Sequence, residues 1–110
     1  MIDYEQFEAV EIHVGTVKAV EPLPEARKPA WVLEIDFGPL GRRKSSAQLT
    51  DMYGREELLG KQVFAVTNLR PRQVGRVLSC CLVLGVYTKQ KAGVVLAGPD
   101  RPVADGLRLL

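Results

Sequence analysis

Three arginines, Arg70, Arg72 and Arg76, lie in a short segment between two apolar runs of the sequence. The runs on either side, 63–66 and 80–86, are rich in residues that favour β-strands and show no helical period. Pro71 stiffens the segment and prevents a continuous ladder there. The pattern therefore predicts a basic loop at the edge of a sheet, which is suited to binding an anion such as a phosphate group.

A second basic segment, residues 42–50, reads Arg-Arg-Lys-Ser-Ser-Ala-Gln-Leu-Thr. In it, Arg43 and Lys44 offer positive charge to phosphates, while Ser46 and Gln48 offer hydrogen-bonding groups. Whether this segment meets the arginine loop depends on the fold. The alternative is that these basic side chains are solvated or pair with the acidic N-terminal part of the chain.

The length and charge of the chain limit the class of protein it can be. The 110 residues suffice for one domain with a modest core, and we expect a single domain over residues 1–110. The net charge of +2 hides an asymmetry: residues 1–36 carry eight acids and three bases, and residues 42–110 carry twelve bases and five acids. Since no run of about 18 apolar residues and no apolar leader is seen, we expect a cytoplasmic protein that does not insert into a membrane.

The residues that most enzymes need are sparse. His13 is the only histidine, so a Ser-His-Asp or Cys-His relay has one possible base and a zinc site lacks a histidine pair. Cys80 and Cys81 are neighbours in an expected strand and lack the spacing of redox or metal motifs. We expect no enzymatic activity, no metal and no cofactor.

The apolar pattern predicts short strands with two short helical segments. We expect a helical turn at 3–8, strands at 11–20, 31–37, 42–50, 63–66, 80–86 and 94–96, a helix at 55–59 and a closing segment at 107–110. Gly15 predicts a bulge or corner in the first strand, and Gly60 should end the helix. This order is that of an all-β OB-fold, a five-stranded Greek-key barrel, with an N-terminal helical turn and a C-terminal extension. An SH3-like barrel shares the strand order but usually lacks the helix.

Several short motifs follow one another along the chain: Ile12-x-Val14-Gly15, Pro24–Arg27, Leu33–Gly38, Leu59–Val63, Asn68–Arg72, Ser79, Val83–Gly85 and Pro99–Val103. In this order and spacing they resemble the tRNA-binding domain family, whose members occur as free-standing proteins, in some aminoacyl-tRNA synthetases and as the export-related chaperone CsaA. The segment Lys44–Gln48 is most similar to the CsaA branch. The sequence differs from the family pattern at His13, Gly75 and Cys80.

The resemblance implies an OB-fold homodimer that binds tRNA and, in the CsaA branch, unfolded polypeptides and secretory preproteins, which would make a secretion motor protein a possible partner. The residues expected to bind RNA are Arg43, Lys44, Ser46, Gln48, Asn68, Arg70, Arg72, Arg76 and Ser79. A tRNA-binding factor that acts mainly through this basic face is the alternative to a chaperone.

Two further sets of residues are expected to bind other partners. No core role is evident in the sequence for Leu69, Val74 and Val77, and we expect them to hold polypeptide. Apolar residues at both ends of the chain exceed what a small barrel needs, and a twofold axis would bury them. The expected dimer residues are Tyr4, Phe7, Leu107, Leu109 and Leu110.

Overall fold

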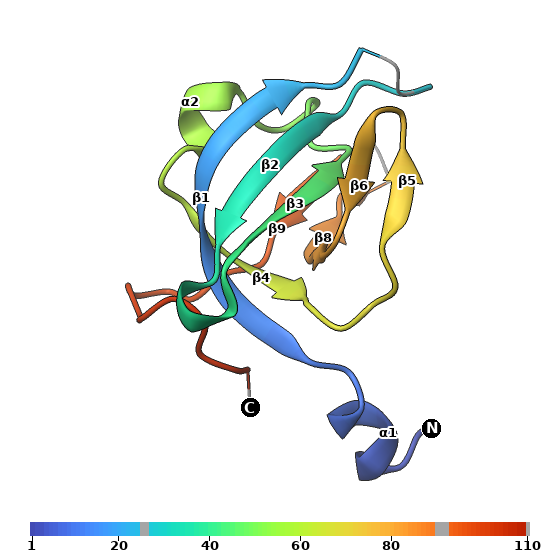
Figure 1. Cartoon of the computed structure of the whole chain (residues 1–110), viewed down its shortest axis with the longest axis vertical. Coiled ribbons are helices and arrows are strands. Elements are labelled where there is room, and N and C mark those ends of the chain that lie inside the picture. Colours follow the sequence, from blue (N-terminus) through green and yellow to red (C-terminus); the bar gives the residue numbers. More distant parts are fainter. Residues whose placement is uncertain (25–26, 90–92, 110) are drawn as a thin grey trace.

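A five-stranded antiparallel sheet, in the order β3-β2-β1-β4-β7, forms the body of the protein in a computed structural model that describes residues 1–24, 27–89 and 93–109 (Figure 1). Its strands are β1 (Ile12–Pro22), β2 (Trp31–Asp36), β3 (Arg42–Ala47), β4 (Gln62–Val66) and β7 (Leu82–Val83). The first three are joined in sequence, and β1 then pairs with β4 on its other side. Strand β3 ends at Ala47, three residues earlier than expected, because Leu49 turns inward to the core.

The long strand β1 bends so that its two halves pair with different strands. Residues Ile12–Thr16 pair with β4, and Thr16–Pro22 pair with β2. The register shifts between Val17 and Ala19, so the bulge lies here rather than at Gly15 as the sequence suggested. Gly15 has a different role: a Cβ atom there would lie 2.6 Å from Ile35 Cγ2, so glycine allows β1 to pass close to β2.

The barrel is nearly closed where β3 approaches the chain that leads into β7. The Cys80 backbone N–H donates to the Lys44 carbonyl over 2.8 Å. Helix α2 (Arg55–Leu58) lies between β3 and β4 in sequence, and its Leu58 side chain is fully buried. Gly60 follows with φ of +84°, a conformation that favours glycine after a helix. The expected OB-like barrel with a helix between strands three and four is confirmed.

The basic loop and the following strand are more divided than the sequence predicted. The loop forms a hairpin of β5 (Arg72–Val74) and β6 (Val77–Ser79), turned by Gly75 at φ of +57°. In place of one strand over 80–86 there are β7 and β8 (Gly85–Tyr87), and β8 pairs with β9 (Val94–Leu96). A short 3₁₀ helix, η1 (Gly38–Leu40), joins β2 to β3.

Two apolar clusters stabilise the fold. The larger fills the barrel and includes Val17, Leu33, Ile35 and Phe37, all fully buried. The smaller lies on the other face of β2, where Val32 packs with Val77 and other residues beneath the β5–β6 hairpin. Because the hairpin covers part of this face, Val32 is buried there, while Glu34 and Asp36 on the same face of β2 are partly exposed.

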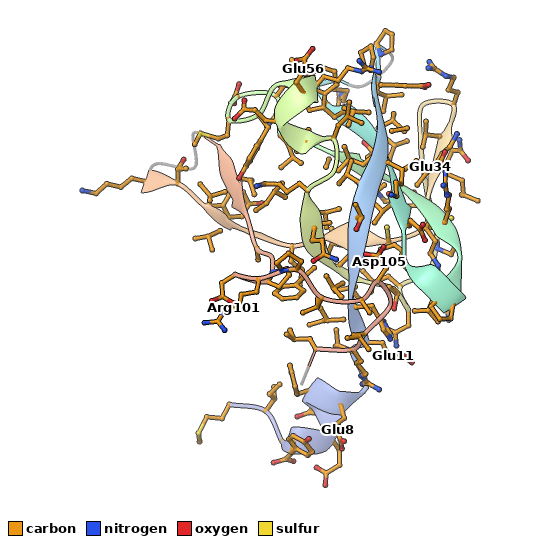
Figure 2. The ribbon with its side chains drawn as sticks, turned by 90° about the vertical axis from the view of Figure 1, so that its left-hand side faces the viewer. Glu8, Glu11, Glu34, Glu56, Arg101 and Asp105 are labelled. Atoms are coloured by element: carbon orange, nitrogen blue, oxygen red, sulfur yellow. The ribbon has the colours of Figure 1, made fainter. Side chains whose placement is uncertain are left out.

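Both chain ends lie at one end of the barrel. Helix α1 (Tyr4–Glu8) projects from the body, and its Glu8 carbonyl accepts a 2.7 Å hydrogen bond from Arg108 Nη2 (Figures 1 and 2). The C-terminal segment lies along β1, with hydrogen bonds from Val14 N–H to the Leu107 carbonyl and from Leu109 N–H to the Ile12 carbonyl. Over the described residues, none of the helices has the length and apolar character needed to cross a membrane.

Candidate functional site

A cleft of about 710 Å³, here called the main cleft, lies between β3, the β5–β6 hairpin and the strands β7 to β9. Ser46 and Gln48 line it from β3 and its continuation, and Arg72 and Val74 line it from β5. Each pair is separated by two positions, so both members of the pair point to the same side of an extended chain. The fold thus brings the two basic segments of the sequence together.

Polar and apolar groups meet in the main cleft. Leu82, on β7, is 49% exposed and provides an apolar surface, while Lys28 and Arg72 provide positive charge. Asp51 is its acidic lining residue. Lys28 and Leu82 were not among the residues expected from the sequence. For Leu82 a signal existed: side chains alternate along a strand, and the neighbouring Cys81 is buried, so Leu82 points outward.

A second cleft of about 530 Å³, here called the outer cleft, lies beside the main cleft on the outer side of β2 and β3. Lys44 and Arg76 line it, as do Arg42, Leu78 and Glu21. The hairpin contributes to both clefts, with Val74 on the main side and Leu78 on the outer side. The residues expected to bind RNA are therefore distributed over two surfaces.

Three residues expected to bind RNA also make hydrogen bonds within the fold. Arg43 lines the outer cleft beside Lys44, but its Nη1 donates to the Thr67 carbonyl over 2.5 Å. Asn68 accepts from the Glu11 backbone N–H (2.9 Å) and donates to the Ala9 carbonyl (2.8 Å), so it ties the start of β1 to the segment after β4.

Ser79 has a comparable internal role. Its Oγ accepts a 3.2 Å hydrogen bond from the Ser46 backbone N–H and donates to the Cys81 carbonyl over 3.4 Å. The side chain therefore ties β6 to β3 across the closure of the barrel. Arg70, by contrast, is exposed on the loop before the hairpin and lines neither of the two clefts.

The three residues expected to hold polypeptide lie in different environments. Val74 lines the main cleft, and Leu69 is half exposed on the loop before the hairpin. Val77 is only 7% exposed and belongs to the apolar cluster beneath the hairpin. The expectation that Val77 has no core role is wrong, because a hairpin that folds back on β2 turns one of its faces inward.

His13 and Cys81 lie within the fold, and Cys80 is partly exposed. His13 is buried with Nδ1 2.8 Å from Thr67 Oγ1, and burial lowers its pKa below the usual 6.5, with Arg108 and Arg43 acting in the same direction and Glu11 opposing. Burial raises the pKa of the Cys81 thiol to about 11. Across residues 1–24, 27–89 and 93–109, no three His, Cys, Asp or Glu side chains form a group that could hold a metal ion.

The residues expected at a dimer interface lie at the end of the barrel where the termini meet. Tyr4 is 67% exposed, Leu107 is 55% exposed, and Phe7 and Leu109 are partly exposed. Tyr4 and Phe7 contact each other, with ring centroids 6.4 Å apart. Leu110, and positions 25 and 26 of the Pro24–Arg27 motif, lie outside the described residues.

Comparison with known proteins identifies the family. Residues 12–108 match the family model described as "Putative tRNA binding domain". The methionine–tRNA ligase of Methanosarcina mazei is 33% identical over 99% of this chain, and the chain spans 15% of that ligase. The one from Methanosarcina acetivorans is 34% identical over 98% of the chain, again with 15% of its length spanned.

Solved structures agree in fold over the whole chain. The chaperone CsaA of Bacillus anthracis str. Ames has a TM-score of 0.94 and 41% identity, covering 100% of this chain and 99% of that one. The CsaA chaperone protein of Picrophilus torridus has a TM-score of 0.93 and 40% identity, with 100% of both chains covered. The chain therefore belongs to the tRNA-binding domain family and has the fold of the CsaA chaperones.

Proposed function

We propose that this protein is a non-catalytic, cytoplasmic binding protein that holds segments of unfolded polypeptide in the main cleft, acts as a homodimer and also binds tRNA. The observation that carries the proposal is the composition of the main cleft, in which the exposed Leu82 lies in the same cleft as Arg72 and the polar side chains of Ser46 and Gln48. Apolar surface attracts the side chains that folded proteins bury, and polar groups can meet an extended backbone.

The comparisons support this combination of roles. The similar solved structures are named as chaperones, and the similar curated proteins are methionine–tRNA ligases, of which this chain spans a small part. The part of the ligase that this chain matches is 15% of its length, and the family model over residues 12–108 is that of a tRNA-binding domain.

The apolar part of the proposal is tested with a matched pair of leucines. Leu82 in the main cleft and Leu78 in the outer cleft are 49% and 50% exposed. Leu82→Ser should weaken binding of a permanently unfolded, carboxymethylated polypeptide by about tenfold, since one well-buried leucine contact is worth about 1.5 kcal/mol. Leu78→Ser should leave that affinity unchanged. Equal affinities of the two variants, measured by fluorescence anisotropy, would contradict the proposed site.

The homodimer is supported by the exposed apolar side chains at the end where the termini meet. Tyr4 and Phe7 on α1 lie at the same end as Leu107 and Leu109, and Arg108 links the two segments through its hydrogen bond to Glu8. Exposed apolar side chains gathered at one end of a small protein are often covered by a partner in solution. Light scattering at micromolar concentration should give the mass of two chains, and deletion of residues 1–8 should give a less stable monomer or an aggregate. A monomeric full-length protein would refute the dimer.

The alternative is a tRNA-binding factor that acts mainly through its basic surface, favoured by the exposed Arg70 and by Arg72. Salt separates the two activities. The affinity for RNA phosphates falls steeply as the salt concentration rises, whereas the capture of apolar side chains tolerates salt.

A secretion motor protein is a further proposed partner. If the bound polypeptide is a secretory preprotein, the protein would pass it to this motor. Co-purification from lysate, with and without added preprotein, tests that partner.

A further inference from the structure

We propose that tRNA and unfolded polypeptide exclude each other from the main cleft, so that RNA controls the release of a polypeptide held there. This inference rests on the proposed function and deepens it, because it states how the two ligands of the protein are related. It predicts that each main cleft holds one of the two ligands at a time.

Three cations of the main cleft are available to a polyanion. Arg27, Lys28 and Arg72 line the cleft, and all three side chains are exposed. None of them forms an ion pair within the described part of the chain. The one acid among the described lining residues is Asp51. Because a concave surface that gathers charge of one sign attracts polyanions, the phosphates of an RNA are drawn to this cleft.

The outer cleft offers fewer available cations. Arg42 forms an ion pair over 3.0 Å, and Arg43 donates to a backbone carbonyl. Arg76 also has a partner, which leaves Lys44. A cation that already has a partner must give it up before it binds a phosphate. The main cleft is therefore the place where an RNA backbone gains most from the cations of the two clefts.

The apolar contact proposed for the polypeptide lies in the same cleft as these cations. Leu82 lines the main cleft from β7, and Arg72 lines it from β5 together with Val74. The cleft measures about 710 Å³, which is the size of a site for one ligand. A polypeptide segment that covers Leu82 and an RNA strand whose phosphates reach Arg72 must therefore occupy the same space.

The main cleft also has groups that suit the bases of an RNA. Tyr87 lines it and is 67% exposed, and Ser46 and Gln48 offer hydrogen-bonding groups. Bases stack on exposed aromatic rings, and their edges bind polar side chains. An RNA should therefore bind more tightly than a polyanion that has phosphates and no bases.

Competition is measured with a fluorescent unfolded peptide of zero net charge, since an anionic peptide would be repelled by RNA bound nearby. The apparent Kd of the peptide should rise in proportion to the tRNA concentration without reaching a plateau. The apparent Kd of tRNA should rise in the same way with added peptide, because coupling between two ligands is reciprocal. Higher salt should remove the effect of tRNA and leave the affinity for the peptide, since RNA binding depends on counterion release.

Charge reversals test whether the competition arises in the main cleft. Lys28→Glu combined with Arg72→Glu should weaken tRNA binding by about tenfold or more at low salt and raise the tRNA concentration needed to displace the peptide by the same factor. The matched control is Lys18→Glu combined with Arg101→Glu, which changes the net charge equally at exposed residues that line neither cleft (Figure 2 labels Arg101). The control should leave the displacement nearly unchanged. If the reversal impairs folding, Lys28→Gln combined with Arg72→Gln gives the same test by removing charge alone.

Each contrary result has a distinct meaning. A peptide affinity that reaches a plateau as tRNA is added would show that both ligands bind together, which overturns this inference and leaves the proposed function intact. Competition that persists in the Lys28→Glu, Arg72→Glu variant but is lost in Lys44→Glu would overturn the placement of RNA in the main cleft. Inorganic polyphosphate that displaces the peptide as well as tRNA does would overturn the assignment to RNA. Wild-type protein that binds no peptide would refute the proposed function itself.

Discussion

The residues expected to bind RNA fall into two groups that have the same chemistry and different surroundings. Arg43, Asn68 and Ser79 use their polar atoms within the fold, at the closure of the barrel and at the start of β1. Lys44 and Arg72, of similar charge, line the clefts with exposed side chains that form no ion pair among the described residues. The difference shows that a polar side chain is available to a ligand only where the fold leaves it without an internal partner.

The same division holds for the apolar residues. Val77 is buried beneath the hairpin, whereas Val74, three positions earlier, lines the main cleft and packs on the edge of the same cluster. Substitutions in the inner group should therefore act on stability and substitutions in the outer group on binding.

Val77→Ser should lower the free energy of unfolding by about 2–3 kcal/mol, because it opens a cavity and buries a hydroxyl group beneath the hairpin. Val86→Ser is the control, since Val86 is 68% exposed on β8 and should change stability little. Urea denaturation of the two variants measures the difference. A Val77→Ser protein as stable as the wild type would show that the hairpin does not pack on β2 in solution.

Arg43→Ala should cost about 1.5–2 kcal/mol of stability, because a charged donor to the Thr67 carbonyl is lost from a half-buried position. Its neighbour Arg42 forms an exposed ion pair with Glu34, so Arg42→Ala should cost about 0.5 kcal/mol or less. Thermal unfolding compares the two. Arg43→Ala should not change the salt slope of RNA binding, and a slope lowered by about 1 would assign Arg43 to the RNA surface after all.

Arg70→Ala combined with Arg72→Ala should change stability by less than about 0.5 kcal/mol, because both residues are exposed and neither side chain forms an ion pair within the described part of the chain. The salt slope of tRNA binding should fall by about 1 for each phosphate contact removed. Titrations between low and moderate salt measure it. Lost affinity with an unchanged slope would indicate a disordered loop rather than lost phosphate contacts.

His13 should give the smallest effect, a pH dependence of stability. Burial lowers its pKa in the folded protein, so the unfolded chain takes up its proton first, near pH 6.5, as the pH falls. The stability associated with neutral His13 is therefore fully present above pH 6.5 and decreases as the pH falls below it. His13→Gln should remove this part of the dependence. Denaturation midpoints at pH 7.5 and pH 5.5 that differ equally in both proteins would exclude His13 as the source.

Much of the fold was predictable from the sequence, because apolar alternation and the glycine that ends a helix are signals within a few neighbouring residues. The alternation of Leu33, Ile35 and Phe37 with Glu34 and Asp36 indicated the inner face of β2 and of the residue that follows it, and Gly60 ended α2 as expected. The motifs around Asn68 and Arg72 also indicated the family correctly. The division of 80–86 into two strands was missed, because β7 pairs with β4 while β8 pairs with β9, and the sequence of the run does not show that its two halves have different partners.

The kinds of groups that this protein offers can be read from its amino-acid sequence: arginines beside a proline, hydroxyls and amides on a third strand, and apolar residues at both ends of the chain. Which of these groups are available to a ligand depends on the fold. Arg43 and Lys44 are adjacent in sequence and similar in charge, yet strand alternation directs one toward the Thr67 carbonyl and the other to solvent. The difference depends on acceptors that lie far along the chain. A buried donor without an acceptor costs free energy of folding, whereas an exposed donor bonds to water or to a ligand.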